Sequence, residues 1–484
     1  MKINAGKKGL VMKKIKIRLR KKIRHNVNYA ILILIFHLFS LILFSCSSPP
    51  EANDDTVTFS GTVTLEDTAD FSGVTVSLYE PVELDTAIVR INQEYPHIGV
   101  QISQETEFDH REHTPKYTTT TKADGSWKIE GVKKGTYNVV AEKEGWGWMY
   151  FTNLELIANM TKDLGILPKI IVLNSNLTQD IILKENQHVL ITSNIVIPEN
   201  ISLNAKQNNW ISLARNVSVE IYGTIDITNS RVVCNTLEEK WQDIETKNNG
   251  KILLNYVVVK NSSAGIKWSG QDQVIIKNCI FTENERALQI VNSRMGLLEN
   301  SVVTENTEGL SFGTVDSMVV RDMIMINNDY ALIGSKGILI TKNCNISHSA
   351  ICAVDFSIGN AHIKNNQFEK NILALNFSAK NKYEINYNNF IQNETDIQTN
   401  YIYYNGTGLY QIHENNFIDT KKFFIYQNTG SAKDTLHAEY NYWGMDEEND
   451  IKLKIIDFYD KNELMVVEIF PIFLNRIQSA GISR

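Results

Sequence analysis

Cysteine is scarce in this 484-residue chain, and the placement of its five cysteines excludes the usual metal sites. No Cys-x-x-Cys pair and no cluster of cysteine with histidine occurs, so the sequence predicts neither a metal site nor a cofactor. In an exported protein, two disulfides could form among Cys234, Cys279, Cys344 and Cys352. We expect buried thiols instead, because stacked repeats would hold Cys279 and Cys344 about 14 Å apart.

Acidic residues are absent from the first 50 positions, whereas the first 24 contain eleven lysines and arginines. Loss of a basic leader that ends at Ser45 therefore takes the formal net charge of the chain from −7 to −18. A chain this acidic is a poor partner for nucleic acid, and for a polyanionic glycan unless a cation bridges the two. The charge thus predicts that the protein has no nucleic-acid partner.

The apolar run of the leader is too short for a typical membrane span. It extends over 16 residues from Tyr29 to Phe44, whereas a transmembrane helix needs ~20. It also follows a strongly basic stretch, which is typical of a signal peptide of residues 1–45. The basic stretch is long, so the sequence leaves open whether translation starts at Met1 or at Met12.

The residues Leu43-Phe44-Ser45-Cys46 resemble the lipobox of bacterial lipoproteins. The resemblance implies that Cys46 becomes the mature N-terminus and carries a diacylglyceryl group, so that a membrane is a partner through this lipid. Ser47 after the cysteine fits sorting to the outer membrane, on the cell surface or on its periplasmic face. The alternative is an uncleaved anchor with an incidental cysteine. Residues 46–55 are expected to form a polar tether.

Beyond the tether, apolar and polar residues alternate as in half-buried strands, first in Val57–Leu65 and then in Val74–Tyr79. With the later Asp124-Gly125-x-Trp127 and Gly135-x-Tyr137, they resemble the carboxypeptidase regulatory-like domain, a small transthyretin-like β-sandwich. The resemblance covers residues 56–165 and implies a spacer or assembly module.

An insertion from about Ala87 to Pro115 interrupts this domain. It contains the run Asp109-His110-Arg111-Glu112-His113, whose two histidines could bind a metal. A solvated loop is the favoured interpretation, because two histidines on a loop lack a third fixed ligand.

A pattern of the form apolar-x-x-Asn-x-apolar recurs between Ile252 and Trp443. Its central residues are Asn255, Asn278, Asn300, Asp322, Asn343, Asn366, Asn388, Asn415 and, in a weaker copy, Asn441. The steps between them are 23, 22, 22, 21, 23, 22, 27 and 26 residues. A period in the low twenties indicates a solenoid, in which each repeat buries its apolar face by stacking on the next. The apolar segments are too short for helices, so we expect a single-stranded parallel β-helix.

The central asparagines are expected to form one ladder, because asparagine tolerates a left-handed bend and stacked carboxamides can hydrogen-bond between rungs ~4.8 Å apart. Inward side chains are expected three residues before them, at Ile275, Leu297, Val319, Ile340, Ile363, Ile385 and Ile412. A second inward set is expected two residues after them, at Ile280, Val302, Ile324, Phe368, Phe390 and Phe417.

Both ends of the repeat region carry a family resemblance. The segments that resemble the first turns and closing rung of a broad family of secreted bacterial right-handed β-helix proteins are Val189–Leu203, Val217–Ile227, Trp241–Ile244, Asn441–Gly444 and Val467–Pro471. The resemblance implies a right-handed β-helix with a C-terminal cap over residues 169–476. It leaves function open, because this scaffold carries lyases, hydrolases, adhesins and passive surface proteins.

The catalytic motifs of polysaccharide lyases and pectin hydrolases on this scaffold are missing, including Asn-Thr-Asp, Gly-His-Gly and Arg-Ile-Lys. One outward column is charged and consists of Lys277, Glu299, Arg321 and Lys342. Alternating charges on stacked strands favour a stabilising ladder, worth about 0.2 to 1 kcal/mol per pair. The catalytic alternative keeps Arg321 and Lys342 as candidate bases beside Glu299.

Two steps lengthen to 27 and 26 residues, which places extra residues in loops between Asn388 and Asn441. The first loop contains Tyr401, Tyr403 and Tyr404, whose rings could stack on sugars or could pack the loop onto the coil. We therefore expect a lipid-anchored envelope protein that binds glycan or another envelope component. The alternatives are a polysaccharide lyase or glycoside hydrolase, and a spacer or adhesin stalk without a small ligand.

Overall fold

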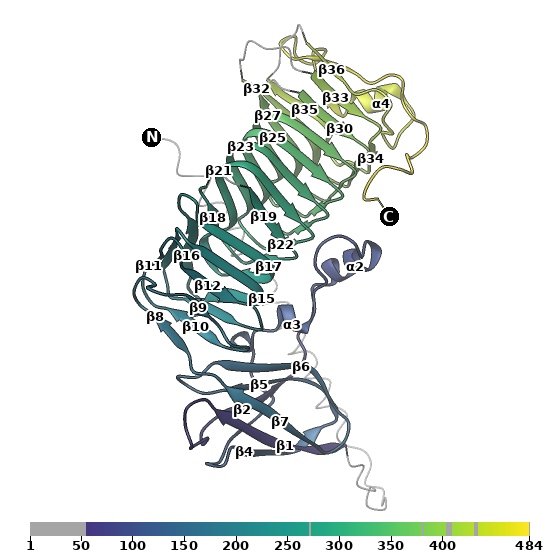
Figure 1. Ribbon diagram of the computed structural model, residues 1–484. Coiled ribbons are helices and arrows are strands. Elements are labelled where there is room, and N and C mark those ends of the chain that lie inside the picture. The colour runs from purple at the N-terminus through teal and green to yellow at the C-terminus, as the bar shows by residue number, and fades with distance from the viewer. Residues whose placement is uncertain (1–54, 271–272, 380–381, 403–408, 430–433, 484) are drawn as a thin grey trace, which may run out of the picture. The chain divides into compact units, whose positions relative to one another are not determined.

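The computed structural model describes residues 55–483, except for 271–272, 380–381, 403–408 and 430–433. A small N-terminal β-sandwich is followed by a parallel β-solenoid of about 11 turns, which confirms the expected fold class (Figure 1). Among the helices in the described ranges, none is long and apolar enough to cross a membrane. The lipobox cysteine Cys46 lies outside the described residues.

The sandwich consists of a three-stranded sheet of order β4-β1-β7 and a four-stranded sheet of order β3-β2-β5-β6. Alternate residues of β1 are buried, and the two sheets enclose one apolar core in which the rings of Phe59 and Trp127 meet edge to face at 4.8 Å. The strands are β1 (Thr56–Leu65), β2 (Thr75–Tyr79), β3 (Tyr117–Thr120), β4 (Ser126–Lys133), β5 (Gly135–Glu142), β6 (Trp148–Leu156) and β7 (Met160–Leu167).

The solenoid strands pair in parallel, each with the strand one turn further along the chain. The first turns contain β8 (Ile171–Leu173), β9 (Ile181–Ile182), β10 (His188–Ile191), β11 (Ile195–Ile197), β12 (Ser202–Ala205), β13 (Trp210–Leu213), β14 (Ser218–Ile221), β15 (Thr224–Cys234), β16 (Trp241–Thr246), β17 (Lys251–Lys260) and β18 (Ser262–Trp268). Inward side chains fill the coil with a continuous apolar core that reaches from Leu173 to Ile469.

From β20 to β27, each turn contains a short strand, a bend, a longer strand and a second bend, and in the later turns two strands take the place of the longer one. The next strands are β19 (Val274–Lys277), β20 (Ile280–Thr282), β21 (Arg286–Glu299), β22 (Val302–Thr304), β23 (Glu308–Arg321), β24 (Ile324–Ile326), β25 (Tyr330–Lys342), β26 (Asn345–Ser347), β27 (Cys352–Lys364) and β28 (Gln367–Glu369). The last turns contain β29 (Leu373–Ala379), β30 (Lys382–Asn386), β31 (Asn389–Ile391), β32 (Thr395–Ile402), β33 (Leu409–His413), β34 (Asn416–Ile418), β35 (Phe423–Thr429), β36 (Thr435–His437), α4 (Glu448–Lys452), β37 (Ile455–Ile456) and β38 (Val466–Glu468).

The sequence predicted a single asparagine ladder, and this prediction is wrong. Its members lie at the bend that precedes the short strand of each turn, but they occupy different positions of that bend. The left-handed residues of this bend are Tyr256, Asn278, Asn300, Asp322, Asn343, Asn365, Tyr387, Glu414 and Tyr440, with φ between 47° and 58°. The expected members Asn366, Asn388, Asn415 and Asn441 lie one residue later and are fully buried. The left-handed residues in these turns are 22 residues apart, from Tyr256 to Asn278 and from Asn343 to Asn365. Both 23-residue steps of the sequence pattern therefore arise because the asparagine moves by one position within the bend, and the turn itself is not longer.

A one-residue slip in a strand turns every side chain to the opposite face, and the expected inward residues divide accordingly. Ile363, Ile385 and Ile412 are buried in the coil as expected. The expectation is wrong for Ile275, Leu297, Val319 and Ile340, which face outward or are half-buried, with Ile275 41% exposed. In their turns the inward residues are the neighbours, such as Met318 and Val320.

The buried asparagines after the bend form a hydrogen-bonded amide ladder. Each Nδ2 donates to the Oδ1 of the next asparagine, over 3.0 Å from Asn366 to Asn388, 3.0 Å to Asn415 and 3.1 Å to Asn441. The same Oδ1 atoms accept from the backbone N–H of the preceding rung. Beside this ladder the rings of Phe368, Phe390, Phe417 and Trp443 stack at 5.1, 4.9 and 4.5 Å.

A second amide ladder lies at the other bend, which the sequence analysis missed. It joins Asn284 to Asn306 and Asn306 to Asn328, and later Asn371 to Asn393, with Nδ2 to Oδ1 distances of 3.0 to 3.1 Å. Within each of these two runs the asparagines are 22 positions apart. The same repeats thus contain a second regularly spaced asparagine, six residues after the central one in the turns of Asn278, Asn300 and Asp322.

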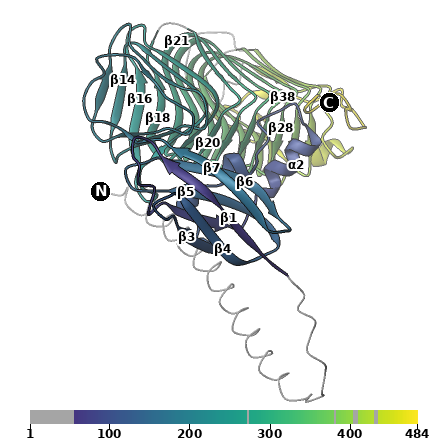
Figure 2. The same ribbon diagram turned by 60° about the horizontal axis from the view of Figure 1, so that its bottom comes forward.

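The insertion in the sandwich covers part of the outer face of the solenoid (Figures 1 and 2). It contains α2 (Thr86–Glu94), α3 (Gln104–Glu107) and the 3₁₀ turn η1 (His110–Glu112). Asp85 caps α2 by accepting the backbone N–H groups of Ala87 and Ile88 at 2.7 and 3.2 Å. The apolar face of helix α2, which includes Ile88 and Ile91, packs on solenoid residues.

The covered solenoid residues are aliphatic and include Ile280, Val302 and Ile324. These three were expected inside the coil, and that expectation is wrong: they point outward and are buried by the insertion. Phe368, Phe390 and Phe417 of the same set are inside, as expected. The C-terminal tail lies along later turns of this face, where Ile477 bonds to Asn416 and Ser483 donates to Asn343 at 2.9 Å.

The run Asp109–His113 is not the solvated loop that the sequence favoured. Asp109 and His110 are buried, and the guanidinium of Arg111 donates to the carbonyl of Cys234 in the solenoid at 2.7 Å. Burial would raise the pKa of Asp109, but hydrogen bonds from Arg111 outweigh it and hold this pKa below its ordinary value. The run therefore ties the insertion to the coil.

Candidate functional site

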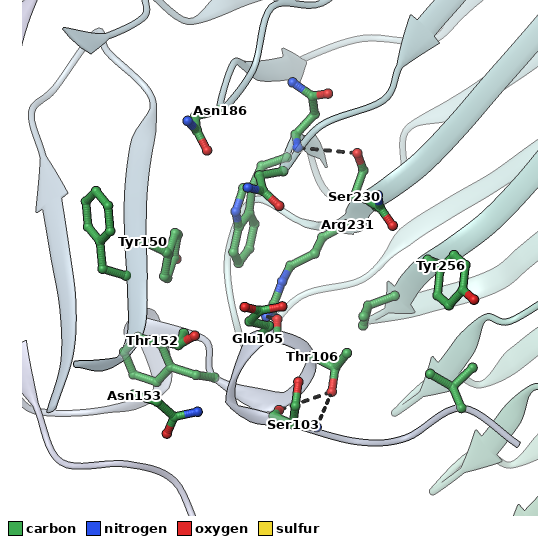
Figure 3. Close-up of a pocket in the computed structure, with 18 of the residues that line it drawn as sticks. Ser103, Glu105, Thr106, Tyr150, Thr152, Asn153, Asn186, Ser230, Arg231 and Tyr256 are labelled. Carbon is green, nitrogen blue, oxygen red and sulfur yellow. Dashed lines mark hydrogen bonds between the residues drawn. The ribbon is translucent and has the colours of Figure 1, made fainter. Parts of the chain in front are cut away.

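A cleft of about 860 Å³ lies between the early turns of the solenoid, strand β6 and residues 99–108 of the insertion (Figure 3). One wall is a column of residues from consecutive turns of the coil. The opposite wall includes Thr152 and Asn153 of β6, and the insertion contributes Ser103, Glu105 and Thr106. The cleft therefore depends on residues from all three parts of the chain.

The coil wall consists of the left-handed residues Asn186, Asn208, Asn229, Tyr256 and Asn278. The left-handed conformation suits asparagine, which tolerates it better than most side chains do. Asn208 and Asn229 are exposed, and Tyr256 is 52% exposed despite its aromatic ring. Stacking of the turns thus presents a row of carboxamides and one open phenol ring, about 4.8 Å apart from rung to rung.

Aromatic rings and a cation form the base of the cleft. The rings of Tyr150 and Trp210 stack at 5.4 Å with an angle of 13°, and the guanidinium of Arg231 lies 4.8 Å from the indole of Trp210. Arg231 also donates to the backbone carbonyl of Glu105. Burial, together with the charge of Asp109, raises the pKa of Tyr150 well above its ordinary value, so its hydroxyl stays protonated.

The lining offers hydrogen-bonding groups, an exposed aromatic ring and a cation. Carboxamides both donate and accept hydrogen bonds, the ring of Tyr256 offers a flat apolar face, and Arg231 supplies a fixed charge. Glu105 is the one carboxylate among the lining residues that the structure describes. The described lining therefore lacks the pair of carboxylates that glycoside hydrolysis ordinarily needs.

The charged column expected from the sequence is present and is made of ion pairs. Lys277, Glu299, Arg321 and Lys342 lie opposite one another on β19, β21, β23 and β25. Glu299 bonds to Lys277 at 2.8 Å and to Arg321 at 2.9 Å. Its burial would raise the pKa of Glu299, but the two cations outweigh this and hold the pKa low. A carboxylate held between two cations is a poor proton carrier.

The expected ligand-binding tyrosines do not belong to the cleft lining that the structure describes. Tyr401 is in β32, but its side chain is not among those described, and Tyr403 and Tyr404 lie outside the described residues. The four cysteines Cys234, Cys279, Cys344 and Cys352 are free and buried, as expected.

The cleft residues could have been found partly from the sequence. Asn186, Asn208 and Asn229 are 22 and 21 residues apart, so the repeat period extends upstream of Asn255, where the repeat was first recognised. The contribution of β6 and the insertion could not be read in this way, because no period links them to the coil.

Comparison of the chain with models of protein families, with curated proteins and with solved structures found no match.

Proposed function

We propose that this protein is a lipid-anchored envelope protein that binds a polysaccharide in the cleft between its solenoid and its insertion. The observation that carries the proposal is the row of left-handed asparagines with the exposed ring of Tyr256. Amides satisfy the hydroxyl groups of a sugar, and an aromatic ring stacks on its apolar face. Residues repeated from turn to turn suit a ligand that is itself a repeating chain.

The ligand we favour is a neutral glycan. The chain without its basic leader has a formal charge of −18, which repels polyanions over the distance that solution ions leave unscreened. The fixed guanidinium of Arg231 would serve as a hydrogen-bond donor to sugar oxygens rather than as a site for many phosphates or sulfates.

Binding would be tested by replacing Tyr256 with alanine and measuring affinity on a glycan array and by calorimetry. Loss of one stacked ring is expected to weaken binding about 2-fold to 13-fold. Tyr440→Ala is the matched control, because Tyr440 is also left-handed and 48% exposed but lies far along the coil, outside the cleft. Equal affinity of the folded Tyr256→Ala variant and the wild type would reject the cleft as the site.

The same samples distinguish the alternatives. Release of reducing ends or unsaturated uronides from any bound polysaccharide would make the protein an enzyme, with Glu299, Arg321 and Lys342 as the first residues to replace. Absence of binding to every glycan tested would favour a spacer.

Lipid anchoring is the second part of the proposal and follows from the resemblance of Leu43–Cys46 to a lipobox. The Cys46→Ala variant is expected to lose the lipid, so lipid labelling should be abolished and the leader should remain uncut. Cys352→Ala is a control for the loss of a thiol, because Cys352 is buried in the coil. Efficient leader cleavage and lipid labelling of the Cys46→Ala variant would contradict the proposal.

A further inference from the structure

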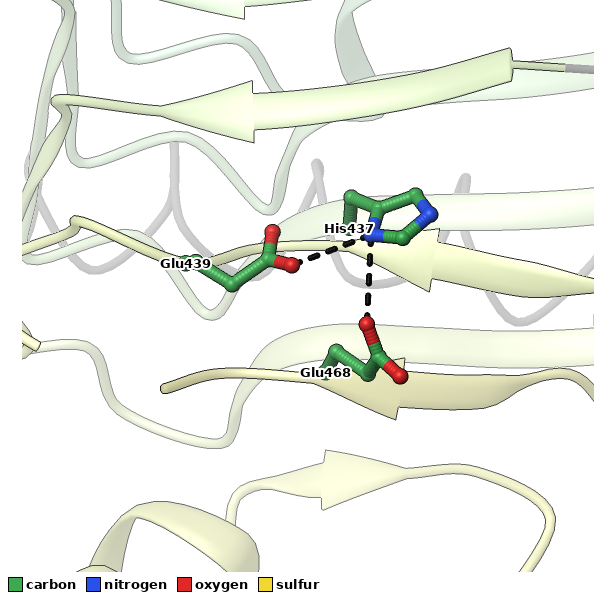
Figure 4. Close-up of side chains that lie close together, drawn as sticks. All are labelled: His437, Glu439 and Glu468. Carbon is green, nitrogen blue, oxygen red and sulfur yellow. Dashed lines mark hydrogen bonds and ion pairs between the residues drawn. The ribbon is translucent and has the colours of Figure 1, made fainter. Parts of the chain in front are cut away.

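Two histidines and two glutamates gather on the outer face of the last turns, far along the solenoid from the cleft. His437 ends β36, Glu439 follows two residues later, and Glu468 ends β38 (Figure 4). The other histidine, His413, ends β33. His437 and Glu468 are register partners on neighbouring strands, so the stacking of the turns brings them together. The sequence predicted no metal site, because Glu468 is 31 residues from His437 and no compact motif joins them.

The distances within this group suit a shared cation. The Nδ1 atom of His437 lies 3.0 Å from Oε1 of Glu439 and 3.3 Å from Oε2 of Glu468, and the three ligand atoms lie within 4.8 Å of one another. Donors placed about 2.0 to 2.2 Å from a tetrahedral ion are themselves about 3.4 Å apart. Small side-chain shifts would therefore place all three atoms around one ion.

The two carboxylates that face His437 Nδ1 could also share a cation. Nδ1 of a neutral imidazole carries at most one proton, so it can serve one of the two carboxylates that face it. The other carboxylate would then lie against a like charge without a donor from this ring. A divalent ion between the carboxylates would neutralise both and leave Nδ1 as a ligand, with the ring proton on Nε2.

His413 holds Glu439 from the other side. Its Nε2 lies 2.9 Å from Oε2 of Glu439, the oxygen that does not face His437. An imidazole that fixes the outer oxygen of a ligating carboxylate is the usual support of a metal ligand. His413 is therefore a positioning residue rather than a ligand.

A pair elsewhere on the same face shows what a plain ion ladder looks like. His362 Nδ1 lies 2.8 Å from Oε2 of Glu384, and Lys382 pairs with the other oxygen of this glutamate. There one carboxylate meets two possible cations, so the charges are balanced without a metal. At His437, by contrast, two carboxylates face one ring nitrogen, and the second histidine, His413, contacts only Glu439.

We propose that His437 Nδ1, Glu439 and Glu468 bind a divalent transition metal ion of the zinc class, with water in the fourth position and His413 orienting Glu439. The nitrogen ligand disfavours calcium and magnesium, which take oxygen ligands. The ion would join β36 to β38, the last rung described in the coil, where only three residue pairs connect the two strands. A bound metal would thereby reinforce the end of the solenoid, which a stacked fold must protect.

The test is calorimetric titration of the chelator-treated full chain in detergent with Zn²⁺. One ion is expected per chain, and His437→Ala should abolish binding. His413→Ala should weaken it about 10-fold to 100-fold, as loss of a supporting partner does, without changing the unfolding midpoint in chelator. The matched control His362→Ala should bind as the wild type does.

Hydrogen exchange supplies a second measurement. Zn²⁺ should slow exchange of the amides of Val466–Glu468 in the wild type and in His362→Ala, but not in His437→Ala. Absence of zinc binding by the wild type, or equal binding by folded His437→Ala, would overturn the proposal and leave an ion-pair ladder only.

Discussion

The first bend of the repeat is built differently in the two halves of the regular solenoid. Upstream, the buried residue after the left-handed position is apolar or small, as in Cys279, Met323 and Cys344. Downstream, the same position holds Asn388 and its neighbours on adjacent turns, joined by amide hydrogen bonds. The upstream turns of this bend are linked by single side-chain hydrogen bonds, as from Asn278 to Asn255 and from Asn343 to Asp322, whereas the downstream turns share one continuous buried amide ladder.

The difference explains how one repeated residue type can have two roles. Upstream asparagines such as Asn300 make the left-handed turn itself, whereas downstream asparagines such as Asn388 satisfy the buried backbone beside the turn. In the downstream turns the left-handed position is held by Asn365, Tyr387 and Glu414, which are three different residue types. The left-handed conformation therefore recurs at the same position of every regular turn, although the residue type at that position varies.

The same asparagine-to-leucine substitution in each half of the solenoid measures how much the two kinds of bend differ in stability. Asn388→Leu should destabilise the protein by about 3 to 5 kcal/mol, because it leaves several buried groups without partners. Those groups include the carbonyl of Ile363, which accepts from Asn388 at 2.8 Å, and the backbone N–H of Asn366, which donates to it at 2.9 Å. Denaturant unfolding of purified variants measures the change.

Asn300→Leu is the matched variant in the upstream half. Asn300 is half-buried at φ 47°, so its replacement should cost about 1 to 2 kcal/mol, the penalty of a left-handed conformation for a larger side chain. Equal losses of stability in the two variants would mean that the downstream amides contribute little beyond the bend.

The period of the repeat was readable from the sequence, but the register within it was not. A strict count predicted the coil, its rung order and the inward position of Ile363, while the same count placed Ile275 on the wrong face. The reason is physical: the left-handed residue and its buried neighbour differ by one position, and asparagine suits both. Only the 23-residue steps, against a 22-residue period, marked the change.

The candidate sites were less predictable than the coil. The ion column around Glu299 followed from stacking alone and is present. The cleft needs the insertion to fold back on the coil, and the group around His437 needs Glu468 one turn away. Neither contact leaves a local pattern in the sequence.

The second amide ladder offers a pH test of buried polar bends in the downstream half. Asp396 is fully buried and accepts hydrogen bonds from Asn393 at 2.8 Å and from Thr420 at 2.6 Å. Burial raises the pKa of Asp396 from its ordinary 3.8 to about 7, despite these two hydrogen bonds. The folded protein therefore holds this proton more tightly than the unfolded chain does.

The raised pKa of Asp396 makes the folded protein less stable as the pH rises. A carboxyl whose pKa is raised on folding stabilises the protein below its unfolded pKa and loses that contribution as the pH rises toward 7. Asp396→Asn removes the proton equilibrium, so relative to the wild type it should gain about 2 to 4 kcal/mol between pH 4 and pH 8. Buried His188, whose pKa is lowered to about 3, acts in the opposite direction but in both proteins. A difference between the two proteins that does not change with pH would show that Asp396 is ionised throughout.

The smallest loss of stability is expected from the outer column of ion pairs around Glu299 in the upstream half. Glu299→Ala removes both ion pairs to Lys277 and Arg321, whose side chains are each 43% exposed, so solvent screens the interactions. The expected loss is under ~1 kcal/mol and should shrink further as salt is raised, because added salt shortens the Debye length from about 10 Å at 0.1 M to about 3 Å at 1 M. Glu384→Ala, in the ladder with His362, is a matched substitution on the same face. A salt-independent loss at Glu299 as large as that of Asn388→Leu would mean that the column bears the coil's stability, and that outer charges rather than inner amides distinguish the two halves.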